Sequence, residues 1–145
     1  MTPGQVVLLV VGILALNVAV WIPALLWVRS RIRTLIEALG AELDASGERT
    51  LVAPEAALYG GATGPYPRAR GNVVVALTNR RVIVRRLVGA GFEIARDDVV
   101  SAREAASFHG RTRSASVVVV TTRAGGEIGL LVREPRAWVA ALGHG

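Results

Sequence analysis

The sequence predicts a single-pass membrane protein in which one N-terminal transmembrane helix carries a small, mainly β domain that ends in an α-helix. Three observations support this prediction. A long uncharged apolar segment lies near the start of the 145-residue chain. After Pro54, short apolar runs alternate with turn residues, as in a β-barrel or sandwich. After Pro135, the apolar spacing is helical again. We therefore expect a transmembrane anchor (1–28), a juxtamembrane connector (29–50) and a β domain (51–145).

The anchor is expected to form a transmembrane helix from Val6 to Val28. This segment has roughly 23 residues and about 35 Å of helix, whereas a hydrocarbon core is about 30 Å thick. Trp21 and Trp27 lie towards one end, where indole rings favour the interface. A cleaved signal peptide is the alternative, but it would have a basic start and an apolar core of about 7–15 residues. Asn17, at mid-depth, is either tolerated there or hydrogen-bonded to a second helix.

Three arginines set the expected orientation. Arg29, Arg31 and Arg33 follow the apolar segment, and no basic side chain precedes it. Because cytoplasmic flanks carry the excess of basic residues, we expect a protein of the cell (inner) membrane with a cytoplasmic C-terminal domain. All 17 basic residues are arginine, and this favours high-GC, bacterial coding.

The connector has an apolar stripe at helical spacing. The spacing i, i+3, i+4, i+7 predicts an amphipathic helix. Its stripe consists of Ile32, Leu35, Ile36, Leu39 and Leu43. The stripe could lie on the membrane surface, pack on the β domain as a continuation of the membrane helix, or pair with a second copy. Self-association is therefore possible through Asn17 or through this stripe.

Seven strands are expected in the β domain. They cover residues 56–60, 72–78, 81–87, 92–95, 99–103, 116–122 and 127–132. The clearest feature is a hairpin with Asn79 and Arg80 as its two-residue turn. This turn places Leu77 opposite Val82 and Val75 opposite Val84, so that these residues and Val73 share a core face. The other face carries Thr78, Arg81, Ile83 and Arg85.

The β domain resembles the pleckstrin-homology-like superfold, particularly its bacterial and GRAM-type members. The resemblance lies in three short pieces: ALTNRRVIV at 76–84, the step from FEI at 92–94 to DVV at 98–100, and VREPRAW at 132–138. It covers roughly residues 50–143. It implies a barrel of two nearly orthogonal sheets, closed at one end by the C-terminal helix with Trp138 as the plug.

No catalytic constellation is recognisable, so we expect a protein that is not an enzyme and has no cofactor. The chain has no cysteine, and His109 and His144 lack metal-ligand spacing. The glycine-rich stretch at 60–64 lacks the Gly-Lys-Ser/Thr ending of a phosphate loop and is interpreted as a flexible loop. There is also no nucleic-acid-binding motif, although the net charge is +6.

The basic residues of the β domain are the candidate contacts with an anionic surface. Arg68 and Arg70 lie in the loop before the second strand, and Arg81 and Arg85 share the outward face of the third. We expect a membrane-tethered binding or scaffolding module that engages a protein partner or an anionic lipid surface. The alternative is an accessory subunit of a membrane transporter or envelope-assembly complex, contacted through the transmembrane helix.

Overall fold

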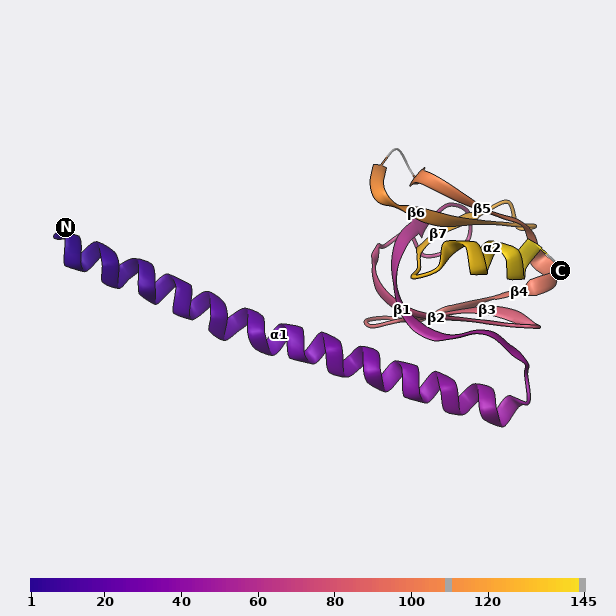
Figure 1. The fold of residues 1–145 in the computed structure, drawn as a ribbon, viewed down its shortest axis with the longest axis horizontal. Coiled ribbons are helices and arrows are strands. Elements are labelled where there is room, and N and C mark those ends of the chain that lie inside the picture. Colours follow the sequence, from indigo (N-terminus) through magenta and orange to yellow (C-terminus); the bar gives the residue numbers. More distant parts are fainter. Residues whose placement is uncertain (109–110, 144–145) are drawn as a thin grey trace.

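The computed structural model describes residues 1–108 and 111–143, with side chains described outside 107–115. It consists of a long N-terminal helix, a seven-stranded antiparallel sheet and a short C-terminal helix (Figure 1). The helices are α1 (Pro3–Ser46) and α2 (Pro135–Gly143), and a 3-10 turn, η1, covers Arg96–Asp98. The strands are β1 (Thr50–Ala62), β2 (Gly71–Thr78), β3 (Arg81–Arg86), β4 (Phe92–Ala95), β5 (Val99–Phe108), β6 (Arg111–Thr122) and β7 (Glu127–Leu131).

The predicted membrane segment and the predicted connector form one continuous helix, α1. Thr2 and Gln5 cap its start through reciprocal side-chain and backbone hydrogen bonds. At its other end, Gly47 adopts a left-handed conformation with φ 71°, which glycine accommodates without steric cost. Its 44 residues correspond to about 66 Å of helix. Among the described residues, it is the one helix long and apolar enough to cross a membrane.

The sheet corrects the predicted architecture. The strands form one open sheet in the order β4-β3-β2-β1-β7-β6-β5, not a barrel of two nearly orthogonal sheets. β1 joins the two halves because it pairs with β2 from Thr50 to Tyr59 and with β7 from Leu58 to Ala62. The strand is longer than predicted, since Pro54 falls at a register shift between Val52 and Glu55, where proline is tolerated.

The main core lies between the two halves of the curved sheet. In Figure 1, α2 lies between the β2–β4 half and the β5–β7 half. Trp138 of α2 is fully buried there, and its Nε1–H donates to Glu55 Oε1 at 3.4 Å. The predicted hairpin register is confirmed, with Leu77 opposite Val82 and Val75 opposite Val84. Both strands contribute their predicted inner face to this core: Val73, Val75, Leu77, Val82 and Val84.

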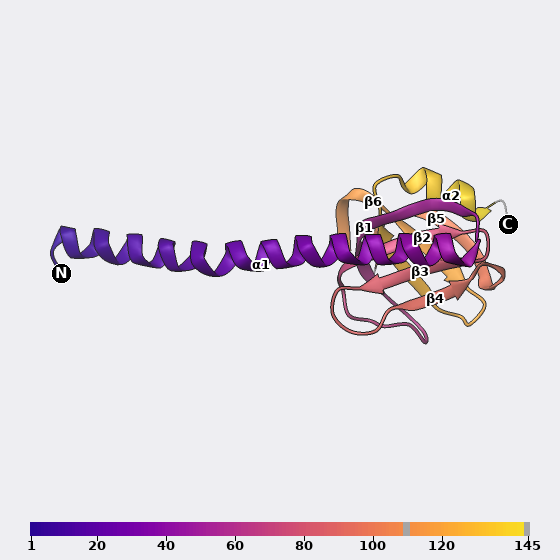
Figure 2. The ribbon, with the colours of Figure 1, turned by 90° about the horizontal axis from the view of Figure 1, so that it is seen from below.

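A second core lies on the opposite face of the same hairpin, under α1. Leu39 and Leu43 of α1 are 1% and 2% exposed. They pack on Val74 and Ala76 of β2 and on Ile83 of β3, with the remainder of the apolar stripe partly buried around them. Figure 2 shows α1 running along the β2–β3 surface. Of the three arrangements open to the connector stripe, the structure therefore shows packing on its own β domain.

Candidate functional site

An ion-pair cluster occupies the outer face of β3, where free arginines were expected. Arg81 lies 3.5 Å from Glu42, 3.1 Å from Glu48 and 2.6 Å from Glu93. Arg85 lies 3.0 Å from Glu42 and 3.2 Å from Glu93. The carboxylates come from α1, from the turn after it and from β4, so the two arginines join three parts of the fold.

The cluster bears on Arg81 and Arg85 as candidate anionic-surface contacts, because both guanidinium groups already pair with carboxylates of the protein. Both side chains do point away from the main core, but α1 covers that face and supplies the opposing charge. Three carboxylates meet two guanidinium groups, which leaves the cluster with no excess of positive charge. Together with the apolar stripe, these pairs attach α1 to the hairpin.

The carboxylates in the cluster are stabilised in their charged form. The hydroxyl of Thr78 donates to Glu48 at 2.7 Å, and this bond, together with the bond and charge of Arg81, lowers the pKa of Glu48. Burial alone would raise the pKa of Glu93, but the hydrogen bonds and charges of Arg81 and Arg85 outweigh it and lower that pKa. Both groups are therefore ionised at neutral pH.

Arg68 and Arg70 lie apart from this cluster, in the β1–β2 loop, and both are exposed. Two tyrosines fasten the loop: the Tyr59 hydroxyl donates to the Pro67 carbonyl at 2.6 Å, and the Tyr66 hydroxyl donates to Thr122 Oγ1 at 2.9 Å. Burial raises the pKa of Tyr59 to about 12, so its hydroxyl remains a donor at neutral pH. The predicted glycine loop is partly wrong, because Gly60 and Gly61 belong to β1.

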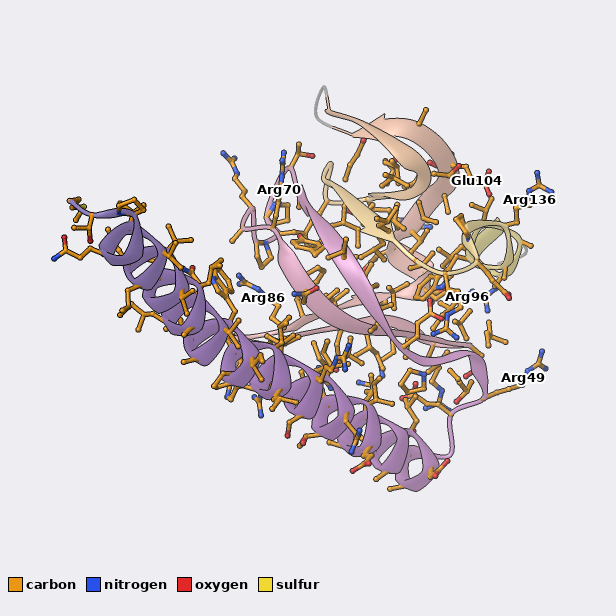
Figure 3. The ribbon with its side chains drawn as sticks, turned by 60° about the vertical axis from the view of Figure 1, so that its left-hand side comes forward. Arg49, Arg70, Arg86, Arg96, Glu104 and Arg136 are labelled. Carbon is orange, nitrogen blue, oxygen red and sulfur yellow. The ribbon has the colours of Figure 1, made fainter. Side chains whose placement is uncertain are left out.

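A cleft of about 280 Å³ lies where α1 first meets the β domain. The apolar end of the expected membrane segment forms one wall, and the β1–β2 and β3–β4 loops with the adjoining ends of β2 and β3 form the other. It is lined by Trp27, Val28, Ala69, Arg70, Gly71, Asn72, Val73, Arg86, Leu87 and Val88. Arg31 Nε–H donates to the Leu87 carbonyl at 3.4 Å and ties the β3–β4 loop to α1. Figure 3 shows Arg70 and Arg86 on the side of the domain that faces the N-terminal half of α1.

This cleft was not predicted from the sequence. Its two walls are roughly 40 to 60 residues apart along the chain, and they meet only because α1 packs on the β2–β3 hairpin. Two signals were nevertheless present. Trp27 marked the expected interface end of the membrane segment. Val88 is an apolar residue in a glycine-containing turn, and it is 71% exposed in the structure.

The other predicted site residues lie on α1 and α2. Arg29 and Arg33 are exposed, as are the apolar side chains between Val6 and Trp27. The Asn17 side-chain amide donates to the Ile13 carbonyl of its own helix at 2.8 Å, so this group already has one intrahelical partner.

The described side chains give no positive indication of catalytic or metal chemistry. Among them, no group of three or more His, Asp or Glu residues is placed to hold a metal ion. His109 and His144 lie outside the described residues. The charged groups that do converge, at Arg81 and Arg85, neutralise one another.

Comparisons with known proteins do not assign a family. No protein-family model matches the chain, and no curated protein matches it. Among solved structures, it is similar to the C-terminal domain of an unknown protein from Leishmania infantum, with 17% sequence identity and a TM-score of 0.45. That likeness covers 69% of this chain and 86% of the other. A likeness this weak assigns neither a fold family nor a function, and the pleckstrin-homology-like resemblance stays a prediction.

Proposed function

We propose that this protein is a non-enzymatic binding and scaffolding module, tethered to the inner membrane and held rigidly at its cytoplasmic face. The observation that carries the proposal is the continuity of α1. The helix that is apolar enough to span a membrane is also the helix whose stripe is buried on the β domain. The domain therefore has a defined position relative to the span.

The geometry of α1 supports a position next to the bilayer. The stripe begins at Ile32, four residues after Val28 and about 6 Å further along the helix. It ends at Leu43, about 22 Å beyond Val28. Because each headgroup layer is about 5–8 Å thick, the domain starts at the level of the headgroups. Arg29, Arg31 and Arg33 at this level support the cytoplasmic orientation.

The ligand that we propose for this module is the anionic lipid surface itself. Arg68 and Arg70 are exposed on a fastened loop, and an arginine close to an anionic leaflet gains about 1 kcal/mol. Arg81 and Arg85 take no part, since their charges are neutralised within the protein. The contact is electrostatic and requires no specific headgroup.

A protein partner is the second candidate, and an open sheet edge favours it. β5 has ten residues and pairs with β6 on one side, at the end of the strand order, and α2 packs against part of it. An edge of this length offers backbone donors and acceptors to an added strand. A related alternative is an accessory subunit of a transporter or envelope-assembly complex, in which the exposed apolar surface of α1 contacts another membrane protein.

Vesicle flotation tests the lipid contact. The fragment 30–145, which keeps the helical cover of the hairpin, should float with anionic vesicles at low salt but not with neutral ones. Release as salt rises is expected because screening shortens the interaction. R68Q/R70Q should lose the binding. R133Q/R136Q is the matched control and should keep the binding, because it removes the same charge from two other exposed positions. Arg133 lies just before α2, and Arg136 lies in its first turn (Figure 3).

The lipid contact and the protein partner predict different results in this experiment. Equal loss in both double variants would mean that net charge alone attracts the fragment and that the β1–β2 loop has no special role. If the wild-type fragment ignores anionic vesicles at low salt, lipid contact is excluded. Binding of a protein partner would then remain as the proposed function, and the β5 edge would be the first surface to test.

A further inference from the structure

The β3–β4 loop combines an exposed apolar tip with a position beside the end of the membrane segment. Val88 is 71% exposed, and it lines the same cleft as Trp27 and Val28. In Figure 2, β3 runs back along α1 towards the N-terminal half of the helix, so the loop after β3 lies on the membrane side of the domain.

The loop has a defined shape. Gly89 adopts φ 89°, a conformation that side chains other than glycine rarely adopt. A Cβ on Gly91 would collide with the Val84 carbonyl oxygen, so the chain returns close against β3. The Leu87 carbonyl accepts a hydrogen bond from Arg31 at 3.4 Å. Since Arg31 lies three residues after Val28, this bond fixes the loop about 4–5 Å along the helix from the end of the span.

We infer that the β3–β4 loop enters the bilayer interface beside α1. In this arrangement Val88 lies at the boundary of the hydrocarbon and Arg86 lies among the lipid phosphates. A phospholipid of the bilayer that α1 crosses occupies the cleft between the helix and the loop. This inference rests on the proposed membrane tether and adds a second point of attachment to it.

The chemistry of the cleft fits this occupant. Trp27 and Val28 present apolar surface next to Val88, which suits the upper acyl chain and the glycerol region. Arg86 and Arg70 line the same cleft and supply positive charge for a phosphate. Apolar surface at one level and cationic side chains beside it are the arrangement that an interface-bound segment needs.

Single-cysteine labelling in the full-length protein tests the inference. The chain has no cysteine, so Val88→Cys and Val100→Cys each give one labelling site. Val100 is the matched control, because it is also an exposed valine, at 61%, and lies at the start of β5 after η1. Each variant is labelled with an environment-sensitive fluorophore and reconstituted in nanodiscs of neutral phosphatidylcholine, or of phosphatidylcholine with phosphatidylglycerol.

The probe at position 88 should emit at shorter wavelength than the probe at position 100. It should be quenched by lipids that carry a nitroxide on the upper acyl chain, and it should be protected from aqueous iodide. The probe at position 100 should show the reverse. If both probes respond to iodide alike and neither responds to the lipid quencher, loop insertion is wrong.

A second pair of variants tests the phosphate contact. Arg86→Gln should move the probe at position 88 towards water. Arg80→Gln, in the turn that precedes the opposite end of β3, should leave the signal unchanged. An unchanged signal in Arg86→Gln would remove the proposed role of that arginine. Both faces of a nanodisc are open to solution, so insertion of the loop does not depend on the orientation of α1 in a cell. Neutral lipid removes the anionic attraction that the flotation experiment measures. Failure of insertion is therefore distinguishable from a wrong topology and from a failed flotation experiment.

Discussion

The two faces of the β2–β3 hairpin are both buried, but by different partners. The inner face packs within the β domain, against strands of the far half of the sheet and against Trp138 of α2. The outer face is covered by α1, through Leu39 and Leu43 and through the carboxylates that pair with Arg81 and Arg85. One face thus stabilises the domain itself, and the other attaches the domain to α1, the proposed membrane anchor.

Removal of the helical cover from the outer face should cause the largest loss of stability. The fragment 47–145 lacks the stripe and exposes Val74, Ala76 and Ile83, which are 0% exposed in the intact chain. Exposure of this apolar surface should make the fragment less stable and less soluble than one that keeps the stripe. Loss of two fully buried leucines corresponds to about 3–6 kcal/mol. Urea unfolding should show the fragment 47–145 to be less stable than 30–145 by this amount, or aggregated.

Equal stability of the two fragments would contradict the role assigned to the outer face. Circular dichroism of both fragments provides the control, because a β-rich spectrum for 30–145 shows that its sheet is formed before the comparison is made.

Truncation of the buried indole tests the inner face. Trp138→Ala removes a ring that is 0% exposed and should lower the free energy of unfolding of 30–145 by about 3–5 kcal/mol. Val139→Ala, on the same helix but partly buried, should have a smaller effect. A loss below about 1 kcal/mol for Trp138→Ala would show that α2 does not hold the core closed.

Loss of the ion pairs on the outer face should cause the smallest change in the free energy of unfolding. That change should depend on pH. The pKa of Glu48 is lowered in the folded state, so its contribution is present above the unfolded value of 4.5. This contribution is lost as the pH falls through the lower folded value. The expected size is about 1 kcal/mol or less. Denaturant titrations at pH 7 and below pH 4 should show a smaller difference between the two pH values for Glu48→Gln than for the wild type.

If the wild type and Glu48→Gln lose the same free energy of unfolding between pH 7 and a pH below 4, other carboxylates cause the acid sensitivity. Glu104→Gln is a suitable control, because Glu104 is exposed on β5 and its change should leave the pH dependence intact.

Local patterns predicted the inner face well, and long-range contacts explain what they missed. The Asn79-Arg80 turn sets the hairpin register within a few residues, and the structure has that register. The joining of both halves into one sheet depends on contacts such as Leu58 with Leu131, which no local pattern contains. Strand ends were also misjudged where proline and glycine lie inside β1.

The candidate site was less predictable because it depends on what α1 covers. The stripe indicated an amphipathic helix but was compatible with three partners. Ile83 was the available signal, because an apolar residue stood between Arg81 and Arg85 on a face interpreted as solvated. A covering element over that face would have implied that these arginines need carboxylate partners, and α1 carries one at Glu42.

In the proposed membrane-tethered arrangement, the unbroken helix also acts as a rigid lever arm. Ser46 lies 18 residues beyond Val28, or about 27 Å along the axis, with the β domain fixed to this arm. Transmembrane helices tilt by about 20° on average, so tilting from upright to that angle swings the end of the arm sideways by about 9 Å. In that arrangement, changes in bilayer thickness or in the packing around residues 6–28 should displace the whole domain across the membrane surface.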